Sequence, residues 1–218
     1  MKKSSVPFLV FSLLIAAAGI LIAVLKLGFV FNGTAASMIN VTQMWLCMLA
    51  GVIFSLLYGF VRFDRAHAVA LAFAALHDFL LTFALTAIAT MVLPKMTSIP
   101  AASTLTTAIV VSIAFVYCQT MIVLREGRQV IRTTSRRDVT LEDAAGLAVS
   151  NSRALRVRVV VALLVLVLAV SLVGGMGLFV AFVPVIISIF VSFYSAEKLT
   201  PYVWASSAAV LKGRKVYK

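Results

Sequence analysis

Charge is scarce in this sequence, and acidic charge most of all. Charged side chains make up 12% of the 218 residues, and only seven residues are aspartate or glutamate. Hydrophobic residues account for 63%, against roughly 45–50% in an ordinary soluble domain. The stretches 6–25, 101–124 and 159–173 contain no charged residue. This composition excludes a soluble globular protein and predicts several membrane-spanning helices.

The sequence also lacks the motifs of the common enzyme classes. It has no P-loop, no G-x-G-x-x-G, no H-E-x-x-H and no nucleophile elbow, so we expect no enzymatic activity, no cofactor and no metal site. Cys47 and Cys118 both fall in apolar segments, where no disulfide is expected. The net charge of +12 does not indicate a nucleic-acid partner, because most of the chain has no solvated surface on which to display it.

Six apolar segments follow one another between charged residues and turn signals. Each is compatible with the roughly 20 residues that a helix needs to cross the hydrocarbon core. The predicted fold class is therefore an all-α integral membrane protein with six transmembrane helices. The segments are Val6–Leu25, Met44–Val61, Ala68–Leu93, Ala101–Leu124, Val159–Gly175 and Leu178–Ala196. The first is too long for the apolar core of a signal peptide, so we expect it to remain as an uncleaved helix.

Basic residues give this topology an orientation. All but Lys26 and Lys95 of the 19 basic residues fall on one side of the six predicted helices. Under the positive-inside rule this side is the cytoplasm, which places both termini there. The loops on the other side are then short, and the last of them is a tight turn at Gly174–Gly177.

Two basic segments are expected on the cytoplasmic side, the loop 125–158 and the tail 197–218. Within the loop, Thr140 and Asp143 form a capping-box pattern that predicts a short amphipathic helix on the membrane face. The arginines of the loop either anchor the topology and attract anionic lipid, or they dock a specific partner.

Ionisable residues at membrane depth are costly, so they are candidates for function. Asp78 is the one acidic residue of the sequence that falls deep in a predicted span, near the bilayer midplane. Thr82 and Thr86 follow at four-residue spacing and form a polar ridge that should face protein. Asp78 is either a protonatable relay group or a buried carboxyl that holds helices together. His77 is its neighbour in sequence but points roughly 100° away on a helix, which favours a packing role.

The fourth apolar segment carries polar residues at helical spacing that complement this ridge. Gln119 lies near the cytoplasmic end of the segment and Ser112 lies two turns deeper. For Gln119 an interhelical hydrogen bond is favoured over a role in transport.

Several short motifs occur in a fixed order along residues 44–204. Arg62-Phe63-Asp64 is followed by Ala75-Leu76-His77-Asp78-Phe79-Leu80-Leu81-Thr82. The later motifs are Thr120–Arg125, Thr140-Leu141-Glu142-Asp143, Asn151–Arg156, Gly174-Gly175 and Phe193–Ala196 with Pro201. This order resembles the SecF subunits of the SecD/SecF family, which assist bacterial protein export and belong to the RND superfamily.

The resemblance implies a SecF-like half-transporter bundle in the bacterial cytoplasmic membrane. Its implied partners are a SecD-like subunit, a SecYEG-like translocation channel and the translocating polypeptide. The family's sizeable domain between the first two helices is absent, since residues 26–43 are all that separates them here. The intramembrane aspartate that the family carries on its fourth helix is matched by Gln119, which cannot titrate. Arg156 matches the family's arginine near the start of the fifth helix and is left without that acid.

Three functions follow as expectations. The first is a SecF-like export subunit. Its proton path either uses Asp78, with Thr82, Thr86 and Gln119 as neutral hydrogen-bond partners, or is supplied by the partner subunit, in which case Arg156 responds to a carboxylate of the partner. The second is an RND-type transporter of small solutes or ions that works as a homo-oligomer. The third is a membrane scaffold whose proton chemistry has been lost.

Overall fold

The chain is seen in a computed structural model that describes residues 6–24, 41–92, 101–133 and 140–211. Within these ranges the side chains of residues 22–24, 41–44, 90–92, 101–112, 176–178, 180 and 181 are not described. Lys26, Lys95, the side chain of Ser112 and the end of the predicted tail at 212–218 therefore lie outside the described residues.

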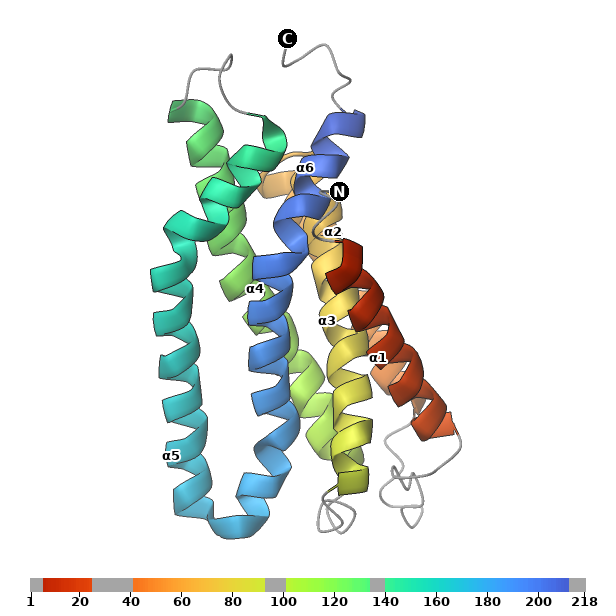
Figure 1. Cartoon of the computed structure of the whole chain (residues 1–218). Coiled ribbons are helices and arrows are strands. Elements are labelled where there is room, and N and C mark those ends of the chain that lie inside the picture. The colour runs from red at the N-terminus through yellow and green to blue at the C-terminus, as the bar shows by residue number, and fades with distance from the viewer. Residues whose placement is uncertain (1–5, 25–40, 93–100, 134–139, 212–218) are drawn as a thin grey trace.

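Every element of the described chain is a helix, and together they form one elongated bundle (Figure 1). The elements are α1 (Val6–Val24), α2 (Val41–Arg62), α3 (Arg65–Val92), α4 (Ala101–Thr133), α5 (Leu141–Lys198) and α6 (Thr200–Leu211). This confirms the predicted all-α class. Each of the six apolar segments coincides with a helix or with one arm of α5.

Three helices in the described part of the chain are long and apolar enough to cross a membrane. They are α2, α3 and the first arm of α5, Leu141–Gly175. The end of α5 and α6, bent by 43° at a short break, pass the same test together and raise the number to four. The described part of the protein is thus all-helical, with several helices of membrane-spanning character.

Helix α3 is the centre of the bundle. It packs against each of the other five helices, and 67% of the residues in its spanning window are buried, compared with 17% in α2. Helix α2 and the first arm of α5 instead expose large apolar side chains, including Phe54, Phe60, Leu166 and Leu172. Such faces are stable only against lipid or another protein, which agrees with a membrane location.

Helix α5 is a hairpin of two arms that turns at one end of the bundle (Figure 1). The turn lies at Gly175, whose φ of 74° is in the left-handed region that glycine adopts without strain. This confirms the turn predicted at Gly174–Gly177. The first arm is Leu141–Gly175, and the return arm, as far as side chains are described, is Phe182–Lys198.

The start of α5 confirms one local prediction and differs from another. Thr140 caps the helix, because its side chain accepts a hydrogen bond from the Asp143 N–H, as the capping-box pattern predicts. The helix that begins there is not a separate short element on the membrane face. It continues into the fifth apolar segment without a break before Gly175, because no glycine turn or proline interrupts the chain between them.

The predicted tail also contains an element that the sequence pattern did not indicate. Residues 200–211 form α6, whose Trp204 is buried against the Gly127 backbone of α4 and the His67 ring of α3, with ring centroids 5.1 Å apart. Pro201 follows the last apolar segment, which the sequence predicts to end at Ala196. In the structure it lies in the first turn of α6, where its fixed φ favours helix formation.

Close packing of α2 on α3 depends on Gly59. A Cβ at this position would lie 2.5 Å from Ala68 Cα, so Gly59→Ala forces the two backbones apart. We expect a loss of about 1–3 kcal/mol in the free energy of unfolding, measured by denaturation in detergent. Gly146→Ala is the matched control, because nothing lies within 4 Å of its Cβ position and alanine favours a helix by about 0.5–1 kcal/mol. Equal stabilities of the two variants would contradict this packing.

Candidate functional site

Asp78 is completely buried in the middle of α3. Its Oδ1 lies 3.0 Å from His77 Nδ1, and its Oδ2 has no hydrogen-bond partner among the described residues. The prediction that His77 points away from Asp78 is wrong. Adjacent side chains diverge by about 100° at the helix surface, but rotation about their side-chain bonds brings the imidazole and the carboxyl together. Which of the two atoms donates depends on the tautomer of the imidazole and on whether the carboxyl carries a proton.

The return arm of α5 faces Asp78 with the Ser195 side chain. Ser195 is itself fully buried, and its Oγ is 3.1 Å from Thr200 Oγ1 at the start of α6. These two hydroxyls lie on either side of the break between α5 and α6, at Leu199. The polar group around Asp78 is therefore built by three helical segments, α3, the return arm and α6.

A row of buried hydroxyls continues from this point along the bundle. Thr82 and Thr86 lie about 6 and 12 Å from Asp78 along α3, and Ser192 and Ser188 lie about 4.5 and 10.5 Å from Ser195 along the return arm. The two segments run in opposite directions, so the hydroxyls fall at similar heights (Figure 1). All four side chains are at most 1% exposed.

The hydroxyls of this row differ in how they are satisfied. Ser188 and Ser192 donate to the carbonyls of Val185 and Ile189 in their own helix, at 2.7 and 3.0 Å. The side-chain hydroxyls of Thr82 and Thr86 make no hydrogen bond within the described part of the chain. A buried hydroxyl without a partner is unfavourable, so its presence at two successive turns marks α3 as a functional candidate.

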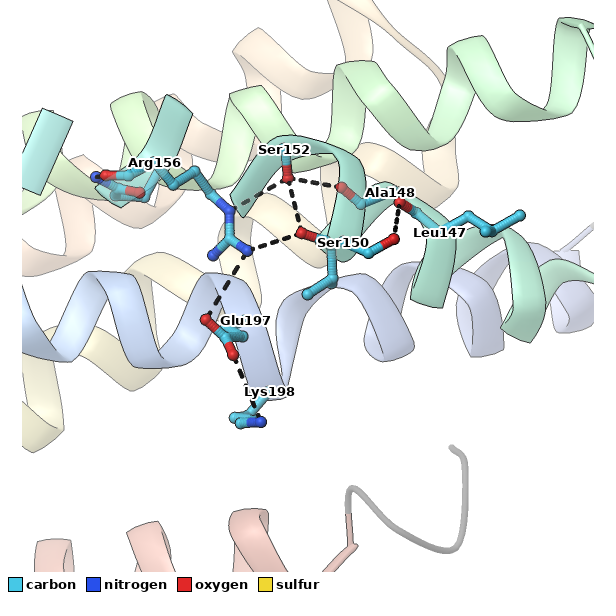
Figure 2. A network of polar contacts seen from close by, with 9 residues as sticks. Leu147, Ala148, Ser150, Ser152, Arg156, Glu197 and Lys198 are labelled. Atoms are coloured by element: carbon cyan, nitrogen blue, oxygen red, sulfur yellow. Dashed lines mark hydrogen bonds and ion pairs between the residues drawn. The ribbon is translucent and has the colours of Figure 1, made fainter. Parts of the chain in front are cut away.

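A second polar cluster surrounds Arg156 on the first arm of α5 (Figure 2). The guanidinium is fully buried; its Nε donates to Ser152 Oγ at 3.2 Å and its Nη2 donates to the Val149 carbonyl at 3.2 Å. It also lies over the Phe193 ring, 5.2 Å from the centroid. Arg156 is thus held by its own helix on one side and by the return arm on the other.

The acid that accompanies Arg156 comes from the same chain. Glu197 Oε2 lies 3.9 Å from Arg156 Nη2, and Glu197 Oε1 lies 3.5 Å from Lys198 Nζ. Arg156 thus lacks the fourth-helix acid of the family, as expected, but Glu197 supplies another one that the sequence did not indicate. The family's fourth-helix acid is matched by Gln119 in this sequence. The return of the α5 hairpin instead brings the Glu197 carboxylate to the guanidinium.

Gln119 joins this second cluster from α4. It is buried, and its Nε2 donates to the backbone carbonyl of Arg156 at 3.5 Å, while its Oε1 has no partner among the described residues. This is the interhelical hydrogen bond that the sequence favoured. Ser112 belongs to α4, and its side chain lies outside the described residues.

The structure therefore groups the predicted site residues into two clusters. Asp78, His77, Thr82 and Thr86 line α3, and Arg156 and Gln119 lie between α4 and α5. The sequence did not indicate the residues that complete them: Ser188, Ser192, Ser195, Thr200 and Glu197. The serines carry one usable signal, a spacing of four and then three residues within an apolar segment, which places them on a single helix face.

The chemistry available here is that of protons and simple ions. Among the described residues no three histidine, cysteine, aspartate or glutamate side chains come together in a way that would hold a metal ion. Hydroxyl groups both donate and accept hydrogen bonds, so a row of them that begins at a carboxyl can pass a proton where hydrogen bonds, direct or through water, join its members. Comparison of the chain with models of known protein families, with curated proteins and with solved structures finds no match.

Proposed function

We propose that this chain is a SecF-like subunit of a protein-export machinery in the bacterial cytoplasmic membrane. In this proposal it works beside a SecD-like subunit and a translocation channel and helps a secreted polypeptide to cross. The observation that carries the proposal is Asp78, a carboxyl with no exposed surface at the centre of an apolar helical bundle. Burying an ionisable group in an apolar bundle is energetically costly, so such a group is a candidate for a functional role.

The buried hydroxyls support a route for protons to and from Asp78. The hydroxyls of Thr82 and Thr86 make no hydrogen bond among the described residues, so in this proposal water molecules join them to Asp78 and complete the hydrogen-bonded chain along which the proton moves. These side chains are all buried, so the proton passes through protein and not along the lipid surface. Gln119 contributes a neutral hydrogen bond and no proton, because an amide does not titrate.

The return arm supports a link between this route and the rest of the bundle. Ser195 faces Asp78, and two residues later Glu197 faces Arg156. The end of the return arm therefore contacts both polar clusters. A change of protonation at Asp78 would alter contacts next to the helix break that follows at Leu199. Helix breaks of this kind are common where transporters move.

The proposal includes six membrane spans with both termini in the cytoplasm. The helical ends support this: α1 begins and α6 ends toward the same end of the bundle, and α5 turns at the opposite end (Figure 1). The last part of α4 and the first part of α5 lie at the end of the bundle where α6 ends (Figure 1), and their sequences include Arg125, Arg128, Arg132, Arg153 and Arg158. This arrangement follows the positive-inside rule and favours contact with anionic lipid there.

Recovery of partners tests the proposal directly. The tagged protein is purified from native membranes in mild detergent, and the proteins that accompany it are identified by mass spectrometry. We expect a SecD-like chain, the translocation channel, or both. A membrane protein of similar abundance with the same tag serves as the control for non-specific recovery.

Two other results would replace the proposal. A stable homo-oligomer with no export component would indicate an RND-type transporter of small solutes or ions. Recovery of the export machinery together with full export activity after loss of Asp78 would indicate a scaffold.

A further inference from the structure

The break between α5 and α6 has features that proton transfer alone does not require. It brings two buried hydroxyls, Ser195 Oγ and Thr200 Oγ1, to 3.1 Å from each other and directs one of them at Asp78. Asp78 Oδ2 is buried without a hydrogen-bond partner among the described residues. This carboxyl oxygen can therefore act as a ligand for a cation.

Backbone oxygens are also released at this point. Pro201 has no N–H, so the carbonyl of Glu197 lacks the donor that a continuous helix would supply. Leu199 N–H bonds to Ser195 O at 3.0 Å and closes the last turn of α5, and the next helix begins at Thr200. Carbonyls at the end of a broken helix inside a membrane protein are typical ligands for a small cation.

The charges around the break select the class of cation. Asp78 is the one carboxylate of the group, since Glu197 faces away toward Arg156 and Lys198. A hard cation of single charge is neutralised by one carboxylate and completed by hydroxyl and carbonyl oxygens, whereas Ca²⁺ is typically bound by several carboxylates. His77 is the one titratable side chain of the described residues that contacts the carboxyl, and it meets Oδ1, which leaves Oδ2 free for the ion.

We propose that Asp78, Ser195 and Thr200 form a binding site for a monovalent hard cation, Na⁺, at the break between α5 and α6. The site rests on the proposed function, because it makes Na⁺ a competitor of the proton at the same carboxyl. Binding of Na⁺ joins α3 to both helices of the break and favours one angle between them. Loss of Na⁺ releases that restraint.

Carbodiimide labelling of the full-length protein in mild detergent tests the site. Dicyclohexylcarbodiimide reacts with a protonated buried carboxyl, and the labelled residue is identified by mass spectrometry. At a fixed, mildly acidic pH we expect NaCl to slow the labelling of Asp78 severalfold, while KCl and choline chloride at equal ionic strength do not. Asp78→Asn removes the label.

Two substitutions place the ion. Ser195→Ala and Thr200→Val each remove one ligand oxygen while nearly preserving shape, and each is expected to raise the Na⁺ concentration needed for half-protection by about tenfold. Ser171→Ala is the matched control. Ser171 is also buried and bonds to its own helix, at 2.7 Å from Val167 O, but it lies on the other arm of α5.

The outcomes separate this site from the proton relay. Labelling that falls as pH rises but does not respond to Na⁺ overturns the cation site and leaves Asp78 as a proton carrier. Unchanged protection in both Ser195→Ala and Thr200→Val overturns the placement of the ion. Thermal unfolding gives a second readout that needs no label: NaCl must raise the midpoint of the wild type above its value in KCl, and must not do so for Asp78→Asn.

Discussion

Replacing Arg156 with alanine is expected to lower the free energy of unfolding by about 2–5 kcal/mol, because it removes a fully buried side chain and one of the two cations that lie near the Glu197 carboxylate. The guanidinium donates to Ser152 and to the Val149 carbonyl and lies 3.9 Å from Glu197. The substitution also removes the side chain that fills the space over Phe193. Equilibrium unfolding of the purified protein in mixed detergents measures the change.

Two variants serve as references for this measurement. Arg153→Ala removes an arginine of the same helix that is exposed, and we expect a change within about 0.5 kcal/mol. Glu197→Gln keeps an acceptor at the edge of the cluster, where the side chain is 12% exposed, and is expected to fall between the two. If Arg156→Ala is no less stable than Arg153→Ala, the cluster does not hold the two arms of α5 together.

The helices could be predicted from the sequence because they depend on local signals. The length of each apolar run predicts a helix, the glycines around Gly175 predict the turn of α5, and Thr140 predicts the N-cap of that helix. Helix α6 was missed because Pro201 stands where the apolar pattern ends, and a proline is compatible with either the end of one helix or the first turn of the next. What decided between them was the burial of Trp204, a contact made by distant parts of the chain.

The candidate site was predictable only where a residue is unusual in itself. Asp78 stands out as a carboxyl in an apolar segment. Arg156 is a candidate because it belongs to the motif Asn151–Arg156, which resembles that of the SecF family. Serine in a membrane helix is common and bonds to its own backbone, so Ser195 gave no separate signal. Glu197 was interpreted as part of the basic tail, and only the hairpin of α5 brings it to Arg156.

If the chain works as the proposed export subunit, replacing Asp78 with asparagine is expected to abolish the part of export that depends on the proton gradient. The amide has nearly the shape of a protonated carboxyl and holds its hydrogen bond, but it neither binds nor releases a proton. Export of a secretory precursor into inverted membrane vesicles, with and without a protonophore, measures the effect. The variant should retain only the rate that the wild type shows with the protonophore present, and the protonophore should then have no further effect.

We expect the Asp78→Asn variant to fold normally, because the substitution removes a buried acid and leaves the packing of α3 unchanged. Its free energy of unfolding should lie within about 1 kcal/mol of the wild type. Glu142→Gln is the matched control, since it removes an exposed acid at the start of α5 and should leave the response to the protonophore intact. Full gradient-dependent export in Asp78→Asn would contradict the relay. Because α3 packs against each of the other five described helices, the proposed binding and release of a proton at Asp78 would act on the central helix of the bundle.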